Sequence, residues 1–380
     1  MKLGLLTTIG TNIGDDFIRE GLLGVIHSYP RRSALETVAV NKHRPESIYP
    51  PWHPMRAAVA AIPELPFGRI KSRALARRLL QTLGPTRFEY CDLLIQCGTP
   101  ILWIQCHRSE WAEPVWRDVL ARLSVKIPLL NLGGGSCYPW EHQPETLLGN
   151  QDEEFARLML AAATLTTVRD PLAAKLLGSL GAVPEVIACP ALLAGQVFEK
   201  PTQPSRRVLV NYMPGGAHTI WGQPIDPKAW EETMREVVGA LRRDWKVTLL
   251  AHSESELAEA ARLWPDLPRI HPLSPPEYFA AGREAAFGIF NRLHAGVALG
   301  GLGVPSVCIG TDTRLLMVKT VGLPIHYAGR VGAADILADA ARLAAERATE
   351  SQRLLALRER TFARYREVLA PWFQEKDNLA

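Results

Sequence analysis

Short apolar runs alternate with amphipathic stretches along most of the chain, and this alternation predicts a series of strands and helices. The clearest unit covers residues 285–312, where Ala286 to Asn291 has the length of a buried strand and Leu293 to Leu302 predicts a compact helix. Gly303 ends that helix, and Val304 to Ile309 predicts a second strand. This order is typical of a parallel sheet covered by helices, whose ligands lie at the carboxyl ends of the strands.

The same alternation continues on both sides of a polar, proline-bearing stretch at residues 199–206, which we interpret as a linker between domains. Expected strands cover residues 2–8, 92–97, 127–132, 164–168, 186–188, 207–212 and 246–251, with a weaker candidate at 35–40. We therefore predict a first domain over residues 1–198, a second over 205–345 and a C-terminal helical segment over 346–380, with a separate parallel sheet in each domain.

Two cationic residues lie at the first turn of the helix in the 285–312 unit. Positive charge there opposes the helix dipole by about 0.3–1 kcal/mol, yet Arg292 and His294 both occupy it. Arg169 repeats the arrangement, because it follows a predicted strand and precedes an Asp170 N-cap. An anion held by these side chains and by free backbone N–H groups would explain the placement. The alternative is a solvated Arg292 and an ordinary helical histidine at 294.

Glycines follow three of the predicted strands. The Gly10–Gly14 loop has neither dinucleotide nor Walker spacing, and it leads into Asp15 and Asp16. These aspartates would repel a phosphate, so we expect the loop to contact hydroxyl groups, with plain helix capping as the alternative. Gly98 and the run Gly133–Gly135 let a backbone approach a ligand closely, although any tight turn uses glycine in the same way.

Composition and charge exclude several classes of protein. The 380 residues are 47% hydrophobic and 22% charged, and a net charge of +4 does not indicate a nucleic-acid partner. The sequence has no apolar run of ~18 residues, no signal peptide pattern and no metal-binding spacing. Six cysteines without a Cys-x-x-Cys pair predict reduced thiols in a cytoplasmic protein. Basic residues between Arg69 and Arg78 indicate a solvated helix face or, as the lesser alternative, a peripheral membrane contact.

Taken together, a set of short motifs in fixed order resembles the polysaccharide pyruvyl transferase family. The matching motifs are Asn12-x-Gly14-Asp15, the strand and turn from Asp92 to Gly98, Gly133–Gly135, Val168-Arg169-Asp170, and Arg292-Leu293-His294-Ala295 with Gly303-x-Pro305. The sequence departs from the family pattern at Cys97-Gly98, where Gly-Gly is usual, at Cys189-Pro190-Ala191, where Asp-Pro-Ala is usual, and at Thr313-Arg314, where many members carry a lysine.

The resemblance implies an α/β fold with two Rossmann-like domains facing a cleft, as in GT-B glycosyltransferases, and a C-terminal helix. It also implies a transferase of exopolysaccharide biosynthesis for the cell envelope. The donor would be phosphoenolpyruvate and the acceptor a sugar diol, free or lipid-linked, at the inner face of the membrane. No cofactor is required by this chemistry, although a divalent ion would be compatible with it. Two alternatives stay open: a nucleotide-sugar glycosyltransferase, with Asp312 or Glu277 holding the ribose, and a non-catalytic sugar- or anion-binding relative.

The resemblance and the local patterns together define the candidate site. We expect Arg169, Arg292 and His294 to bind the donor, and His294 and Asp15 to act in catalysis. The acceptor side would be formed by Asn12, Gly14, Gly98, Gly133, Gly134 and Gly135. Trp103 and Trp111 are core residues or surfaces on which a sugar ring stacks.

Overall fold

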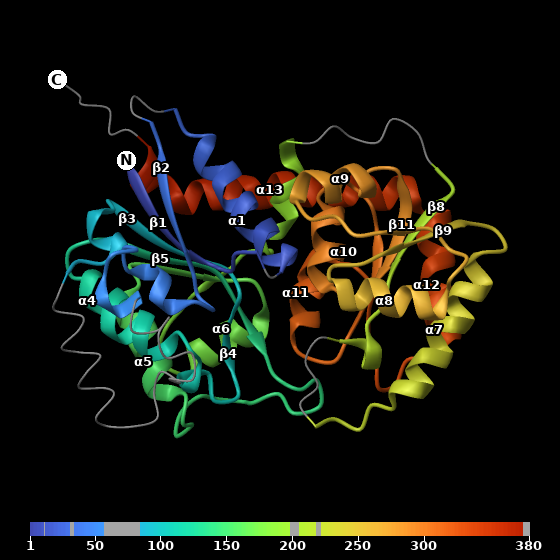
Figure 1. The fold of residues 1–380 in the computed structure, drawn as a ribbon, viewed down its shortest axis with the longest axis horizontal. Helices are drawn as coiled ribbons and strands as arrows, with labels where there is room; N and C mark the ends of the chain where they lie inside the picture. The colour runs from blue at the N-terminus through green and yellow to red at the C-terminus, as the bar shows by residue number, and fades with distance from the viewer. Residues whose placement is uncertain (11, 31–33, 57–83, 198–204, 218–221, 375–380) are drawn as a thin grey trace.

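Two parallel sheets organise the molecule. The computed structural model describes residues 1–10, 12–30, 34–56, 84–197, 205–217 and 222–374. In these ranges the first sheet has the strand order β2-β1-β3-β5-β6-β7, with β4 paired to β5, and the second has the order β10-β9-β8-β11-β12-β13. All of these strand pairs are parallel, and the sheets lie side by side in Figure 1.

Each strand expected from the sequence is present, with ends that differ by a few residues, whereas β4, β10 and β13 were not predicted. The first sheet contains β1 Lys2–Thr7, β2 Glu36–Asn41, β3 Leu93–Cys97, β4 Pro100–Trp103, β5 Leu129–Cys137, β6 Leu165–Val168 and β7 Glu185–Val186. The second contains β8 Arg207–Asn211, β9 Lys246–Leu250, β10 Arg269–Ile270, β11 Ala285–Phe290, β12 Ser306–Gly310 and β13 Ile325–Tyr327. The central strands β3, β11 and β12 are buried along their whole length, as strands covered on both faces must be.

Helices cover both faces of each sheet. The first domain contains α1 Ile13–His27, α4 Ala121–Leu123, α5 Glu153–Ala162, α6 Pro171–Gly178 and the short helices η1 Pro45–Ile48, η2 Arg87–Tyr90, η3 Cys106–Arg108, η4 Ala112–Leu120 and η5 Pro190–Val197. The second contains η6 Pro214–Gly216, α7 Pro227–Leu241, α8 Glu254–Leu263, α9 Pro275–Gly282, α10 Leu293–Gly300, α11 Arg314–Val321 and α12 Ala333–Ala345. One apolar core continues from α1 and η5 into α9 and α10, where Phe17 packs on Tyr278 and Phe279. This shared core fixes the two sheets side by side.

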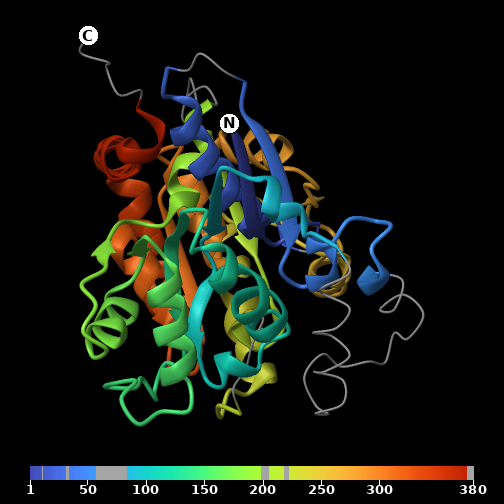
Figure 2. The same cartoon turned by 90° about the vertical axis from the view of Figure 1, so that its left-hand side faces the viewer.

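The C-terminal helical segment expected over residues 346–380 contains α13 Arg347–Phe373, which begins just after α12 ends at Ala345. The long α13 crosses from the second domain to the first in Figure 1 and is seen nearly end-on in Figure 2. Arg353 near its start donates to the Val321 carbonyl at 2.9 Å, and near its end the Arg366 carbonyl accepts from the Tyr29 hydroxyl. The helix therefore ties both domains together.

The prediction that Gly133–Gly135 forms a turn after a strand is wrong, because all three residues lie within β5. A side chain on any of them would collide with protein: the Cβ position is 2.8 Å from the Pro190 ring at Gly133 and 2.6 Å from Ile101 at Gly134. Gly133 also has φ +66° at a register shift between β5 and β6. Gly98 does follow its predicted strand, and the next element after it is β4, which begins at Pro100.

Some predictions fall partly outside the described residues. The basic cluster between Arg69 and Arg78 and residues 199–204 of the proposed linker both lie there, so the domain limits stay a prediction. Within the described part of the chain, every helix is too short or too polar to cross a membrane. All six cysteines are free thiols.

The strand order of each sheet places a crevice at its centre. In the first sheet the order reverses between β1 and β3, and in the second it reverses between β8 and β11. Open parallel sheets bind ligands at the carboxyl ends of the strands beside such a reversal. The residues that follow these strands are therefore the ones to examine for a functional site.

Candidate functional site

Two adjoining cavities lie at the strand reversals. The larger has a volume of about 500 Å³, and its lining includes Thr8, Asp15, Lys42, Thr99, Trp103 and Trp111 from the first domain and Arg292, His294 and Arg314 from the second. The smaller lies against the second sheet, and its lining includes Met213, His252, Asn291, Thr311 and Asp312. Asn12, Arg292, His294 and Arg314 line both. The two cavities thus form one cleft between the domains.

Arg169 and His294 meet across the domain boundary. Arg169 Nη1 donates to His294 Nε2 at 3.0 Å, and the Arg169 side chain is completely buried. Its Nε and Nη2 atoms have no hydrogen-bond partner among the described residues. Beside it, Cys189 Sγ lies 3.7 Å from Nη1, and burial raises the pKa of that thiol, so it stays neutral. Among the described residues, Arg169 therefore makes no ion pair with a carboxylate, although the buried Asp170 lies close enough for the two charges to interact.

His294 is held in its neutral form. Burial and then the charge of Arg169 lower the pKa of His294 to about 3, although Asp15 acts in the opposite direction. Because Nε2 accepts from Arg169, the hydrogen-bond pattern assigns the imidazole proton to Nδ1. That atom lies beside Gly14, where an added Cβ would stand 2.9 Å from it. His294 therefore reaches the cleft as a neutral hydrogen-bond donor.

Arg292 and Arg314 each have a carboxylate of their own. Arg292 Nη2 lies 2.6 Å from Glu256 Oε1, and Arg314 Nη2 lies 2.6 Å from Asp312 Oδ2. Arg292 occupies the N-cap position of α10, and its backbone N–H is satisfied by Asn211. Both guanidinium groups remain partly exposed to the cleft. Arg314 was predicted only as a departure from the family pattern, although its position after β12, at the first residue of α11, resembles the pattern that identified Arg292.

Asp15 faces a cation that sequence reasoning missed. Burial tends to raise the pKa of Asp15, but Lys42 and then His294 outweigh it and lower the pKa below its usual value. Lys42 immediately follows β2, the weaker of the predicted strands, and is only 3% exposed. The helix itself is capped by Asn12, whose side chain accepts from the Gly14 N–H at 3.1 Å. Asp15 is thus not the capping residue and projects its charge into the larger cavity.

The glycines assigned to the acceptor side have different surroundings. Gly14 lines the smaller cavity. Gly98 has φ +52°, and its Cβ position is 2.5 Å from Ile18. The Cβ position of Gly135 lies 2.6 Å from Arg169 Nε, so this glycine makes room for the buried guanidinium. Gly98 and Gly135 therefore pack against protein and shape the floor beneath the cleft.

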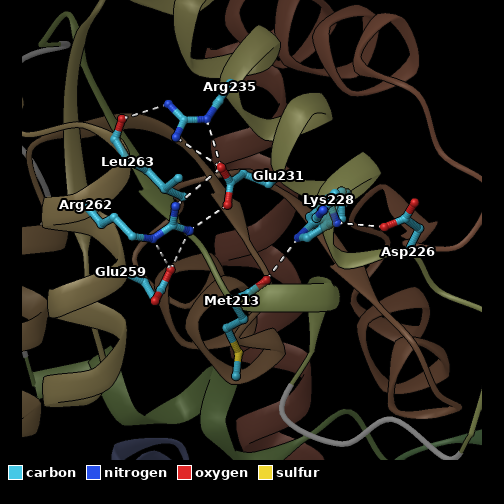
Figure 3. A network of polar contacts seen from close by, with 9 residues as sticks. Met213, Asp226, Lys228, Glu231, Arg235, Glu259, Arg262 and Leu263 are labelled. Carbon is cyan, nitrogen blue, oxygen red and sulfur yellow. Dashed lines mark hydrogen bonds and ion pairs between the residues drawn. The ribbon is translucent and has the colours of Figure 1, made fainter.

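The wall of the smaller cavity is anchored to α7 and α8. The Met213 carbonyl accepts from the Trp230 indole at 3.0 Å, and the Met213 N–H is satisfied by Asn291. Figure 3 shows the adjoining ion-pair network, in which Glu231 joins Arg235 on its own helix to Arg262 on α8. These contacts place the turn after β8 against the cleft.

The four cations around the cleft differ in how their charges are compensated. Arg292 and Arg314 are each paired with an acidic side chain, whereas Arg169 and Lys42 share the field of Asp15. A buried cation without a compensating charge is costly unless a ligand supplies one. The carboxylates of Asp15 and Asp170 compensate the charges of Lys42 and Arg169, so what stays open beside the cleft is hydrogen bonding: Nε and Nη2 of Arg169 have no partner among the described residues. In the described ranges, no group of three or more metal-ligating side chains is assembled.

Solved structures share this architecture at low sequence identity. A Listeria monocytogenes protein named as a UDP-N-acetylglucosamine 2-epimerase is 14% identical with a TM-score of 0.57, and the alignment covers 99% of this chain and 97% of that one. The Neisseria meningitidis UDP-GlcNAc 2-epimerase, solved with UDP-GlcNAc, is 12% identical with a TM-score of 0.52, over 98% and 99% of the two chains. Trehalose-6-phosphate synthase is 9% identical with a TM-score of 0.53, over 99% of each chain. These likenesses show a GT-B-like fold.

The sequence itself matches one family. No curated protein matches the chain significantly. The family model for polysaccharide pyruvyl transferase matches residues 12–313, which include Asp15, Arg169, Arg292 and His294. The match covers most of the chain and both sides of the cleft, and the chain belongs to the polysaccharide pyruvyl transferase family.

Proposed function

We propose that the protein transfers the pyruvyl group of phosphoenolpyruvate to two hydroxyls of a sugar in a polysaccharide or its precursor and forms a cyclic ketal. The observation that carries this proposal is the completely buried Arg169, which lacks a carboxylate partner and is bonded to a neutral His294 at the meeting point of the two domains. A substrate with both a phosphate and a carboxylate offers oxygen acceptors to the unpartnered nitrogens of Arg169 and to the partly exposed Arg292 and Arg314.

The chemistry needs no oxidant and no cofactor. Two carbon–oxygen bonds form at C2 of the donor, the C2–C3 double bond is lost, and the bond from C2 to the phosphate oxygen breaks. The proton of one sugar hydroxyl is balanced by protonation of the methylene carbon, and the proton of the other leaves with the phosphate. The protein must therefore stabilise departing negative charge and accept a hydroxyl proton.

Each group of the cleft has a role in this scheme. His294 donates Nδ1–H to the departing phosphate, because its lowered pKa keeps it neutral and its Nε2 is held by Arg169. Arg292 and Arg314, partly exposed at the cleft, bind the outer donor oxygens. Asp15 stays ionised, because its pKa is lowered, and it orients and deprotonates the acceptor hydroxyl. A neutral histidine that polarises a substrate oxygen is an established way to avoid placing another cation in such a site.

The ribose-holding roles considered for Asp312 and Glu277 are less compatible with their contacts. Asp312 is buried and receives both Nε and Nη2 of Arg314. Glu277 lies at the start of α9 and accepts from Ser274 and from the Leu273 N–H. Both carboxylates already accept hydrogen bonds from other residues of the protein, which favours pyruvyl transfer over transfer from a nucleotide sugar.

Ligand-induced thermal stabilisation tests the donor assignment. Phosphoenolpyruvate at 100 times its dissociation constant should stabilise the protein by about 2.7 kcal/mol, whereas UDP- and GDP-sugars at the same concentration should not. The shift should disappear in Arg169→Met. Stabilisation by a nucleotide sugar, with no response to phosphoenolpyruvate, would transfer the assignment to the glycosyltransferase class.

A further inference from the structure

Lys42 is a buried cation whose role the donor scheme does not use. Its Nζ donates to Thr99 Oγ1 and lies 5.0 Å from the ring centroid of Trp111. Thr99 has φ +85°, a region that residues other than glycine rarely adopt. Such backbone strain persists only where the surrounding structure imposes it, and it clusters at active sites and ligand-binding sites. Here the strained residue supplies the hydroxyl that holds the ammonium.

The surroundings of Lys42 leave part of its ammonium group for a ligand. An ammonium carries three hydrogens, and Thr99 accepts one of them. Burial lowers the pKa of Lys42, Asp15 raises it in part, and Arg169 lowers it further. Both Lys42 and Asp15 line the larger cavity. A hydroxyl between them would accept from Nζ and donate to the carboxylate.

An aromatic surface lies next to this pair. Trp103 packs against Trp111 with ring centroids 5.2 Å apart and planes inclined at 56°, and both line the larger cavity. Trp111 is buried and faces Lys42, whereas Trp103 keeps part of its surface exposed. Pockets that bind small molecules combine apolar walls with a few directed polar groups, and this one adds a tryptophan to a lysine–aspartate pair. A pyranose ring, with an apolar face and hydroxyls at its edge, matches that combination.

We infer that Trp103 and Lys42 form the acceptor-ring subsite. The pyranose stacks on Trp103, and its reacting hydroxyl lies between Lys42 Nζ and the Asp15 carboxylate. Trp111 and Thr99 position the lysine and do not contact the sugar. This inference rests on the proposed function, because it assigns the acceptor side of the same cleft.

Saturation-transfer NMR with methyl glycosides of glucose, galactose and mannose, recorded with phosphoenolpyruvate present, tests the subsite. The wild-type protein should give a signal with at least one glycoside, and Lys42→Met and Trp103→Ala should weaken that binding at least tenfold. The matched controls Lys228→Met and Trp52→Ala replace exposed residues and should bind as the wild type does. If a truncated variant does not fold, Lys42→Arg and Trp103→Phe replace it; each should bind the glycoside more weakly than the wild type, and wild-type binding by both would overturn the subsite.

The outcomes separate the subsite from the donor assignment. In Lys42→Met and Trp103→Ala, the thermal shift caused by phosphoenolpyruvate should stay within twofold of the wild-type shift. In Trp103→Ala, the KM for the acceptor should rise by a larger factor than the factor by which kcat changes. If glycoside binding depends on both residues but phosphoenolpyruvate does not stabilise the protein, the acceptor subsite is supported and the assignment of phosphoenolpyruvate as the donor is wrong. Wild-type glycoside binding by both variants, or no binding by the wild type itself, overturns the subsite.

Discussion

Arg169 Nη1 donates to His294 Nε2 across the domain boundary, at 3.0 Å, and this contact links the electrostatics of the two sheets. The arginine follows β6 in the first domain, and the histidine lies in the first turn of α10 in the second. The bond sets the imidazole tautomer, and the arginine charge helps to keep the ring neutral. Because Arg169 is completely buried, a change in the distance between the domains would break the contact and expose both groups.

Replacement of Arg169 by methionine should stabilise the ligand-free protein while it abolishes donor binding. The methionine fills similar volume and removes a buried guanidinium with two unpartnered nitrogens, each of which costs about 1–3 kcal/mol. Urea unfolding and phosphoenolpyruvate titration by calorimetry measure the two effects. The matched control is Arg358→Met, which removes a buried arginine that is bonded to the Gly301 carbonyl and to Glu359 and should destabilise. Equal destabilisation by both variants would contradict the assignment of Arg169 to an anion.

Gly14→Ala should lower the turnover number clearly and the melting temperature only slightly. The new methyl group would stand 2.9 Å from His294 Nδ1 and 3.0 Å from its Cβ, so the imidazole must shift away from Arg169. Gly24→Ala on the same helix is the control, because nothing lies within 4 Å of its Cβ position, and it should stabilise by about 0.4–1 kcal/mol. Steady-state kinetics and thermal melts of both variants check the prediction. Unchanged turnover in Gly14→Ala would show that the imidazole position is not critical.

His294 should make the protein less stable as the pH falls. Its folded-state pKa of about 3 lies below the ordinary value of 6.5, so the unfolded chain binds more protons between these pH values. The stability that this histidine contributes is therefore complete above pH 6.5 and is lost as the pH falls towards 3, by less than about 1.4 kcal/mol per pH unit. Urea unfolding between pH 7 and pH 5 should show a shallower loss in His294→Asn. An identical slope in the variant would mean that the histidine is not held neutral.

Arg292→Lys should weaken donor binding although it conserves the charge. The arginine directs both Nε and Nη2 to Glu256 Oε1, and lysine has no planar fork that could contact this carboxylate and a donor oxygen together. We expect the dissociation constant for phosphoenolpyruvate to rise at least tenfold in calorimetry, with the fold retained. Arg235→Lys, which alters an exposed ion pair with Glu231, is the control and should bind the donor normally. Normal affinity in Arg292→Lys would place the donor away from this residue.

Asp15→Asn should retain donor binding and lose turnover. The amide keeps the shape of the side chain but cannot accept a hydroxyl proton, and it removes the negative charge facing Lys42. Because the aspartate would repel a phosphate, its loss should leave phosphoenolpyruvate affinity equal or stronger. Calorimetry and a ketal-formation assay separate these effects. If Asp15→Asn loses donor affinity as severely as an arginine variant does, the assignment of the donor and acceptor sides of the cleft must be exchanged.

Most of the strand and helix order, and the local position of the donor-side cations, could be predicted from the amino-acid sequence alone. Short buried runs are recognisable because a strand covered on both faces must be apolar throughout, as β11 and β12 are. Arg169 and Arg292 were identifiable because each lies between a strand and a helix, which is a local pattern. Lys42 follows the weak β2 pattern and belongs to none of the motifs, so its place beside Asp15 could not be predicted.

Which of these groups meet, and which charges are neutralised, depends on how the two domains pack together. Glu256 and Asp312 pair with Arg292 and Arg314, whereas Arg169 receives a neutral thiol and a histidine instead. The physical reason is that charge compensation and burial depend on distances between residues far apart in the chain. Likewise, a run of glycines such as Gly133–Gly135 occurs both in tight turns and in strands that have no room for side chains. The packing of Pro190, Ile101 and Arg169 against these glycines shows that this run is a crowded strand.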